Sequence, residues 1–234
     1  MLTLEIAPHV YQLTIRVANI VLIVEEKLSL IDTGLYGSST QIVDFIRRLG
    51  RSVEEIGLII ITHNHFDHMG GLAELRELTR ARVAAHKAGI VNTDEELPFP
   101  GGRGVGKLLR FRPFSSLRRH LALKPEDVDI LLEGGEVLEP LGGLKVIHTP
   151  GHSPGSISLF SPGNKLLIVG DALVRSRKSL GLPYKMVSID RTQAIDSVRE
   201  MAQLDFDILC FGHGRPLTGD AHARLIQLLE KTEG

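Results

Sequence analysis

The sequence contains only one cysteine, Cys210, in 234 residues, which excludes an internal disulfide. A reducing compartment is the simplest expectation for such a chain, and we expect the protein in the cytoplasm. The first residues lack the basic segment and the long apolar core of a secretory signal peptide. Apolar runs such as residues 20–24 are far too short to cross a bilayer, so we expect no membrane partner.

The sequence also lacks an excess of charge of either sign. It has 27 Lys and Arg against 28 Asp and Glu, which gives a formal net charge of −1. No field of the whole molecule therefore favours nucleic acid or an anionic surface, and we expect no nucleic-acid partner. Hydrophobic residues make up 43% and charged residues 24%, as in ordinary globular proteins. We expect a single domain over residues 1–234 with a substantial core.

Apolar runs separated by turn residues predict a mixed α+β arrangement. Runs of β-forming residues at 20–24, 28–32 and 58–61 predict strands in the first half, and 144–148, 165–170 and 207–211 predict strands in the second. Apolar positions at helical spacing predict helices over about 39–49, 70–79 and 219–231, and Asp190 with Gln193 is typical of a further helix start. This order predicts two mixed sheets flanked by helices.

The densest cluster of polar side chains directly follows the buried strand predicted at 58–61. Three imidazoles and one carboxylate fall within six positions: His63, His65, Asp67 and His68. Removing so many polar groups from water is costly unless something binds them. Neutral imidazole and carboxylate are the usual ligands of zinc-like divalent ions. The loop is therefore predicted to bind metal, and a solvated turn that happens to be rich in His is the alternative.

Three later turns repeat this arrangement of apolar strand, Gly or Pro turn and ligand-type side chain. His152 follows the strand at 144–148, Asp171 follows 165–170, and His213 lies between two glycines after 208–211. Strands of one sheet deliver their turns to a common edge, so residues far apart in the sequence can form one site. We therefore expect these three side chains to join the first loop.

The full series, His-x-His-x-Asp-His followed by Gly-His, Gly-Asp and Gly-His, resembles the metallo-β-lactamase fold superfamily. The resemblance extends from Asp32-Thr33-Gly34 to Gly212-His213-Gly214 and implies an αββα four-layer sandwich of two mixed β-sheets flanked by helices. It implies a dinuclear centre in which one metal is held by His63, His65 and His152, the other by Asp67, His68 and His213, and Asp171 bridges both. Asp32 resembles an aspartate of the family that steadies the ligand loop.

The resemblance implies a dinuclear metal-dependent hydrolase of the glyoxalase II-like or lactonase-like branch. Two divalent ions about 3.5–4 Å apart can share a water and lower its pKa to near 7, which supplies a bridging hydroxide as nucleophile. The implied metal is Zn²⁺, with Mn²⁺ or Fe²⁺ as alternatives. Asp67 and Asp171 are the expected catalytic residues, because Asp67 can orient the hydroxide and Asp171 fixes the metal separation. The expected substrate is a small ester, thioester or lactone.

Differences from known branches narrow this expectation. Asp171 stands where the best-known β-lactamases carry Cys, which argues against β-lactam hydrolysis. Glyoxalase II continues with a glutathione-binding domain, whereas only about twenty residues follow His213 here. Val174 stands where quorum-quenching lactonases carry Tyr, and Tyr184 either reaches the site or packs elsewhere. Three alternatives stay open: a phosphodiesterase, a non-catalytic metal-stabilised binding module, and a persulfide dioxygenase-like oxidoreductase with one iron on His68, His152 and Asp171 or a near variant.

The segment from about 87 to 124 is predicted to be a basic, lid-like insert. Between residues 103 and 124 it holds seven Lys or Arg and no acid, interleaved with apolar side chains. One interpretation is a lid over the metals that favours an anionic small-molecule substrate. The others are a solvated amphipathic helix and a homodimer contact through Phe111 and Phe114.

Overall fold

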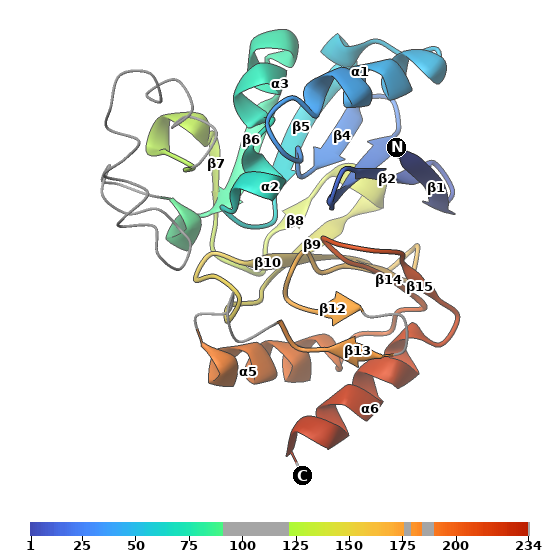
Figure 1. Ribbon diagram of the computed structural model, residues 1–234, viewed down its shortest axis with the longest axis vertical. Coiled ribbons are helices and arrows are strands. Elements are labelled where there is room, and N and C mark those ends of the chain that lie inside the picture. The colour runs from blue at the N-terminus through green and yellow to red at the C-terminus, as the bar shows by residue number, and fades with distance from the viewer. Residues whose placement is uncertain (91–121, 176–178, 184–189, 234) are drawn as a thin grey trace.

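Two β-sheets lie face to face between two layers of helices (Figure 1). The computed structural model describes residues 1–90, 122–175, 179–183 and 190–233. Most of the predicted basic insert, residues 91–121, and Tyr184 lie outside the described residues. The α+β four-layer architecture predicted from the sequence is confirmed. In the part of the chain that is described, no helix has the length and apolar character needed to span a membrane.

The first sheet has seven strands in sequence order. They are β1 (Leu2–Ala7), β2 (Val10–Ile15), β3 (Ala18–Val24), β4 (Leu28–Ile31), β5 (Ile56–Ile61), β6 (Arg82–His86) and β7 (Ile130–Leu132). Strands β1 to β4 are antiparallel neighbours, whereas β4 to β7 pair in parallel. Parallel pairs need crossover connections, which here contain α1 (Ser39–Arg48), and then α2 (Phe66–Met69) and α3 (Leu72–Thr79). The carboxyl ends of β4, β5 and β6 therefore meet at one edge.

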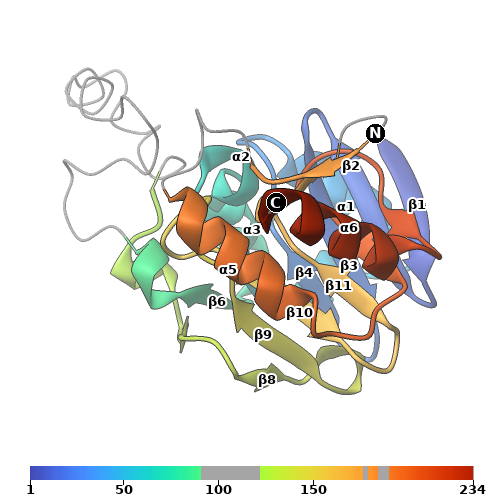
Figure 2. The ribbon, with the colours of Figure 1, turned by 90° about the horizontal axis from the view of Figure 1, so that it is seen from below.

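The second sheet has the strand order β15-β14-β11-β10-β9-β8. Its strands are β8 (Val137–Leu138), β9 (Leu144–His148), β10 (Ile157–Ser161), β11 (Leu166–Ile168), β14 (Ile208–Cys210) and β15 (Leu217–Thr218). Helices α5 (Arg191–Met201) and α6 (Ala221–Glu233) cover its outer face (Figure 2). A separate pair is formed by β12 (Val174–Arg175) and β13 (Leu180–Gly181). Among the described residues, the 3₁₀ turns are η1 (Val53–Glu55), η2 (Lys87–Gly89), η4 (Pro125–Asp127) and η5 (Pro140–Gly142).

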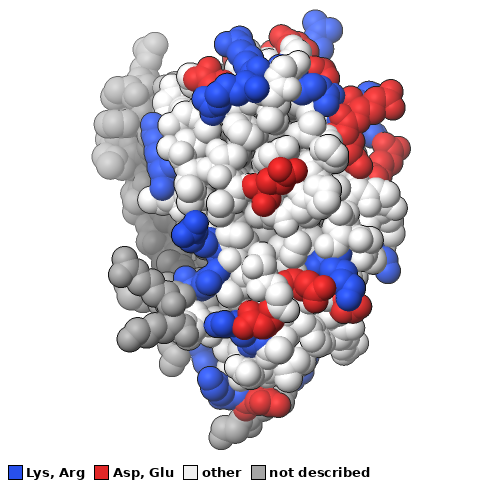
Figure 3. All heavy atoms as spheres, turned by 90° about the vertical axis from the view of Figure 1, so that its right-hand side faces the viewer, with Lys and Arg blue, Asp and Glu red and all other residues white. Residues whose placement is uncertain are grey.

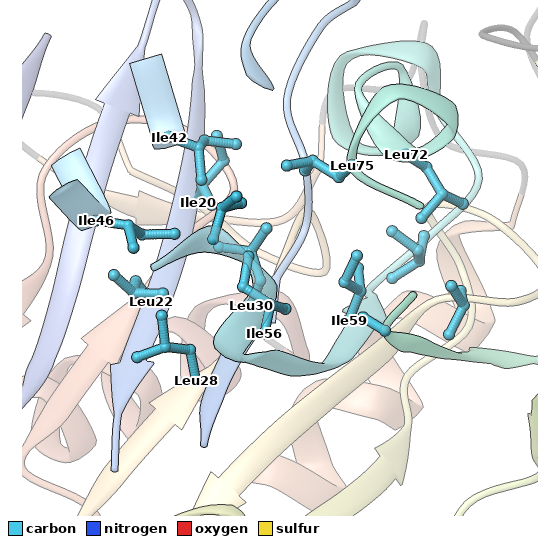
Figure 4. Close-up of a cluster of buried hydrophobic side chains, with 14 of the residues drawn as sticks. Ile20, Leu22, Leu28, Leu30, Ile42, Ile46, Ile56, Ile59, Leu72 and Leu75 are labelled. Atoms are coloured by element: carbon cyan, nitrogen blue, oxygen red, sulfur yellow. The ribbon is translucent and has the colours of Figure 1, made fainter. Parts of the chain in front are cut away.

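Three apolar clusters hold the four layers together. The first, which contains Ile59, Ile42 and Leu72, lies between the seven-stranded sheet and helices α1 and α3 (Figure 4). A second cluster fills the space between the sheets, and a third lies under α5 and α6. Strand β3 is buried along nearly its whole length, which explains why its sequence is apolar without alternation. Full burial of one such side chain contributes about 1.5–3 kcal/mol, so the packed layers can hold polar turns rigidly at their edge.

Candidate metal centre

All seven ligand-type residues predicted from the sequence lie at one edge of the two sheets. They are delivered by the turns after β5 (His63, His65), the short helix α2 (Asp67, His68), and the turns after β9 (His152), β11 (Asp171) and β14 (His213). Main-chain hydrogen bonds hold these turns together: Ile157 N donates to Thr62 O across 2.9 Å, and Gly212 N donates to Gly170 O across 2.7 Å. The common edge expected from the strand order is therefore present.

The ligand atoms form three overlapping groups. Within each group, one atom from each residue lies within 4.8 Å of the others: His63, His65 and His152; His63, His68 and Asp171; Asp67, His68 and His213. Asp171 stands between the outer groups, with Oδ2 3.6 Å from His152 Nε2 and 3.3 Å from His213 Nε2. The His68 side chain is fully buried, whereas that of His213 is 38% exposed, so the centre opens to solvent beside His213.

Three of the imidazoles are oriented by hydrogen bonds on the nitrogen that faces away from the centre. Nδ1 of His68 donates to Asp32 Oδ2 across 2.8 Å, and Nδ1 of His213 donates to Val17 O across 2.6 Å. Nδ1 of His63 lies 3.1 Å from Thr62 Oγ1. An oxygen acceptor on Nδ1 selects the tautomer whose Nε2 carries a lone pair. The Nε2 atoms are therefore turned toward the common space, where each can offer a lone pair to a cation once it carries no proton.

Asp32 connects the first loop to the end of the neighbouring strand. Its Oδ1 accepts from the main-chain N–H of Thr62 and its Oδ2 from Thr62 Oγ1, each across 2.8 Å. The residue has a φ of 61°, a left-handed conformation that costs about 1–2 kcal/mol for a side chain other than Gly. Its three hydrogen bonds, including that from His68, offset this cost. The steadying contact that the resemblance implies for Asp32 is thus present in the structure.

The buried polar atoms of the centre lack enough partners in the protein. His63 Nε2, His152 Nδ1 and Asp171 Oδ1 are buried and have no hydrogen-bond partner among the described residues. Buried polar groups of native proteins are nearly always paired, and a bound ion is one explanation for those that are not. His63 Nε2 and Asp171 Oδ1 belong to the groups whose atoms converge, and imidazole nitrogen with carboxylate oxygen suits a zinc-like ion. The residues present fit a bound divalent metal.

The charges of the centre also favour a cation. Burial, followed by repulsion from His68 and His152, holds the pKa of His63 well below its usual value, so this imidazole is neutral. Burial alone would lower the pKa of His68, but the carboxylates of Asp171 and Asp32 outweigh it and raise the pKa to about 9. Burial raises the pKa of Asp171, but His68 and His213 outweigh it and lower the pKa overall. Without a metal, the carboxylates therefore retain a proton on His68.

Sequence reasoning missed several residues that shape the centre. A Cβ on Gly212 would collide with Asp171 Oδ1 and would lie 2.6 Å from His68 Cε1, so only glycine leaves room for both. Thr62 could have been noticed, because it stands between the buried strand and the first ligand. Val17 could not have been noticed, because it orients His213 through its carbonyl oxygen, which every residue type has.

The remaining polar candidates lie apart from these groups. Cys210 is fully buried in the cluster between the sheets, and burial raises the pKa of its thiol. The rings of His86 and His148 stack at 3.9 Å on each other, and neither was predicted to be a ligand. The set His68, His152 and Asp171 is not one of the three converging groups among the described residues. The variant set His63, His68 and Asp171 is one of them.

The sequence profile of the metallo-beta-lactamase superfamily matches residues 13–213, a stretch that contains every ligand-type residue described above. The chain belongs to this superfamily. Over 231 residues it is 30% identical to the probable metallo-hydrolase YflN of Bacillus subtilis, covering 92% of this chain and 87% of that protein. It is 34% identical over 169 residues to the acyl-coenzyme A thioesterase MBLAC2 of Gallus gallus, covering 68% of this chain and 58% of that protein.

A solved structure shares the fold of this superfamily member. The metallo-beta-lactamase family protein TTHA1429 from Thermus thermophilus superposes with a TM-score of 0.73 at 22% identity, covering 98% of this chain and 81% of that one. The family match and the metallo-hydrolase relatives make this protein a metal-dependent hydrolase. Divalent metal binding, which the superfamily implies, agrees with the three His and Asp groups at the sheet edge.

Proposed function

We propose that this protein is a dinuclear metal hydrolase that cleaves a small thioester, ester or lactone, with a thioester as the first candidate. The observation that carries the proposal is the presence of two outer ligand groups with Asp171 between them. His63, His65 and His152 would hold one metal, and Asp67, His68 and His213 the other. Zn²⁺ is the metal that this donor set suits best, and Mn²⁺ or Fe²⁺ are the alternatives.

Each residue of the centre has a separate task in this proposal. When bound, the two cations supply a nucleophilic hydroxide at neutral pH and polarise the scissile carbonyl. Asp171 lies between the two sides, with Oδ2 3.6 Å from His152 Nε2 and 3.3 Å from His213 Nε2, and Oδ1 3.6 Å from His68 Nε2. Asp67 Oδ2 lies 3.4 Å from His213 Nε2, on the side that faces solvent. Its carboxylate is therefore placed to hold and pass on a proton of the attacking water.

The thioester is favoured by the relatives and by the shape of the opening. MBLAC2 is named an acyl-coenzyme A thioesterase. In this chain His213 is 38% exposed, whereas His63 and His152 are nearly fully buried at 2%. A substrate would therefore approach from the His213 side, and a large leaving group could stay in solvent. A small-molecule thioester with a bulky, anionic carrier fits this approach.

Metal analysis combined with a substrate panel tests the proposal. Protein purified without oxygen should hold two zinc or manganese per chain and should hydrolyse at least one thioester, ester or lactone. His65→Ala should lose one metal and the hydrolytic activity while the chain stays folded. His222→Gln is the matched control, because His222 donates to Ala202 O between α5 and α6 and belongs to no ligand group. Hydrolysis near the wild-type rate in His65→Ala would contradict the two-metal assignment.

A mononuclear iron oxidoreductase is the second candidate, favoured by the converging set His63, His68 and Asp171. Two imidazoles and one carboxylate with open positions are typical of non-haem iron oxygenases. One iron per chain and oxygen uptake on a persulfide would support this candidate and contradict the hydrolase. The same panel should include a phosphodiester, because its hydrolysis would support the phosphodiesterase alternative.

A further inference from the structure

A groove of about 370 Å³ opens where the free edges of the two sheets come together. One wall is β1, the edge strand of the first sheet, and the other includes β15, the edge strand of the second. Figure 1 shows both strands on the same side of the molecule. The lining combines apolar side chains with two guanidinium groups: Leu4, Ile6, Pro216, Arg175 and Arg215.

The two chain segments that carry Asp171 and His213 continue directly into this groove. Gly214 O accepts from Gln12 Nε2 across 3.0 Å and from Asn19 Nδ2 across 2.7 Å, which holds the turn after His213 against the first sheet. Arg215 is the next residue. Arg175 lies four residues after Asp171, and its carbonyl oxygen is 3.9 Å from where a Cβ on Gly214 would be. A molecule that reacts beside His213 can therefore extend along this turn to the two arginines.

The Arg175 side chain is held in place at the groove by two main-chain oxygens. Nη1 of Arg175 donates to Arg215 O across 3.0 Å and also contacts Pro216 O, which fixes the guanidinium against the turn. Arg215 itself is exposed. Burial, and then the nearby charges of Arg224 and Arg215, lower the pKa of Arg175, and the nearby Asp220 partly offsets them. An anion placed between Arg175 and Arg215 would relieve the repulsion between them.

Two described acids, Asp220 and Glu5, lie near the groove. Asp220 is paired with Arg224 across 2.8 Å. Glu5 also lines the groove, but its carboxylate accepts from the main-chain N–H of His9 across 3.1 Å. Because side chains alternate along a strand, Glu5 points to the opposite face of β1 from Leu4 and Ile6. Figure 3 shows this side of the molecule, where Lys and Arg lie along the left of the described surface and Asp and Glu lie among uncharged atoms nearer the centre.

We propose that Arg175 and Arg215 bind the phosphate groups of the substrate's carrier, so that the substrate is a thioester of a phosphorylated carrier such as coenzyme A. The proposal rests on the thioester hydrolysis proposed above. Guanidinium groups bind phosphate oxygens in pairs, and the apolar walls suit the uncharged parts of such a carrier. The acyl group would lie at the metal positions. The phosphates would lie beside Arg175 and Arg215, which follow Asp171 and His213 by four and two residues in the sequence.

A comparison of two thioesters tests the proposal. Acetyl-coenzyme A carries the phosphates, whereas S-acetyl-N-acetylcysteamine has the same thioester without them. Arg215→Gln should raise the ratio of KM for the first substrate to KM for the second by about 5- to 20-fold, as expected for the loss of a partly exposed charged contact. Arg47→Gln, at the exposed end of α1, should keep the wild-type ratio. Added salt should raise KM for acetyl-coenzyme A in the wild type more than in Arg215→Gln.

Binding measurements keep the two proposals separable. Calorimetry with dethio-coenzyme A, which has no thiol to reach a metal, should show binding to the metal-loaded wild type that weakens in Arg215→Gln. Arg175→Gln should act in the same direction, with its fold checked by circular dichroism because Arg175 also holds the turn. An unchanged KM ratio in both variants would overturn the groove assignment and leave the hydrolase intact. If neither thioester is cleaved, the proposed hydrolysis fails, and the dethio-coenzyme A titration alone decides whether the groove binds phosphates.

Separate titrations with ADP and with inorganic phosphate provide the comparison for dethio-coenzyme A. A groove that recognises the whole carrier should bind dethio-coenzyme A more tightly than either. Equal affinity for inorganic phosphate would contradict carrier recognition.

Discussion

The carboxylate of Asp32 and the imidazole of His68 are joined by a hydrogen bond of 2.8 Å between Oδ2 and Nδ1, and neither side chain is more than 3% exposed. This contact determines which nitrogen of His68 faces the metal positions. Asp32 therefore acts on the metal centre through His68, although it belongs to none of the ligand groups.

If the centre holds two cations as proposed, replacing Asp32 by Asn should selectively weaken the position that contains His68. Asn has nearly the same shape, but its amide N–H₂ would face Nδ1 of His68 or the Thr62 hydroxyl, so the tautomer with a free Nε2 is no longer favoured. We expect the affinity for the second metal to fall by about 10- to 100-fold, while the first metal is kept. Zinc content after dialysis against chelators of graded strength measures this. Asp44→Asn, at an exposed position of α1, is the control, and two tightly held zinc ions in Asp32→Asn would contradict the role of Asp32.

Metal uptake should release a proton from His68. Its pKa is raised to about 9 in the metal-free protein, so at pH 7 the ring is protonated, and Nε2 must lose that proton to bind a cation. Metal affinity should therefore rise with pH and level off near pH 9. Calorimetric titrations at pH 7 in two buffers with different ionisation enthalpies should give different heats, whereas identical heats would contradict proton release.

The same group should give the metal-free protein a pH-dependent stability. The pKa of His68 is higher in the folded state than the 6.5 of an unperturbed imidazole. Its contribution to the free energy of unfolding is therefore complete below pH 6.5. The contribution should be lost as the pH rises through about 9. Urea unfolding of the metal-free protein at pH 6 and pH 9 measures it, and Asp32→Asn should reduce the difference. A stability that is flat over this range would show that other groups compensate.

A methyl group at position 212 should disrupt the centre. In Gly212→Ala the new Cβ would collide with Asp171 Oδ1, so the carboxylate or the strand end has to move. We expect the zinc-induced rise in melting temperature to be lost and the fold to be destabilised by about 1–3 kcal/mol. Gly163→Ala is the control, because a Cβ at that position would meet nothing within 4 Å. An undiminished response to zinc in Gly212→Ala would show that the site tolerates the displacement.

Truncating Ile59 should lower stability without removing any ligand atom. The residue is fully buried on β5, directly before the ligand loop (Figure 4). Ile59→Val should cost about 0.5–1.5 kcal/mol and Ile59→Ala about 2–5 kcal/mol in urea unfolding. Val137→Ala, at a position that is 61% exposed, should change stability by less than about 0.5 kcal/mol. Zinc content should stay at the wild-type level under conditions where each variant is folded.

The positions of the ligand-type residues could be predicted because each follows an apolar strand that is long enough to recognise. The run at 58–61 lies within β5 and the run at 165–170 contains β11, and the residues after these strands reach the common edge. Strands β12, β13 and β15 were not predicted, because two residues carry no periodicity. Their pairing depends on partners that are distant in sequence, as in the contact between Leu209 and Leu217.

The orientation of the imidazoles could be predicted only in part. The resemblance indicated Asp32, whose side chain is distinctive. Val17, which orients His213, and Gly212, which leaves room for Asp171 and His68, left no such signal, because the first contributes its carbonyl oxygen and the second the absence of a Cβ. Backbone geometry of this kind becomes visible only when the chain is folded.

The hydrogen bond from His213 to Val17 joins residues 196 positions apart. During synthesis on a ribosome, the three histidines of the first metal position emerge well before His213 does. Domains tend to acquire structure from their N-terminal part first. If the protein binds two cations as proposed, a nascent chain can capture one of them early, whereas the second has no complete coordination shell until β14 and the turn that carries His213 have been translated.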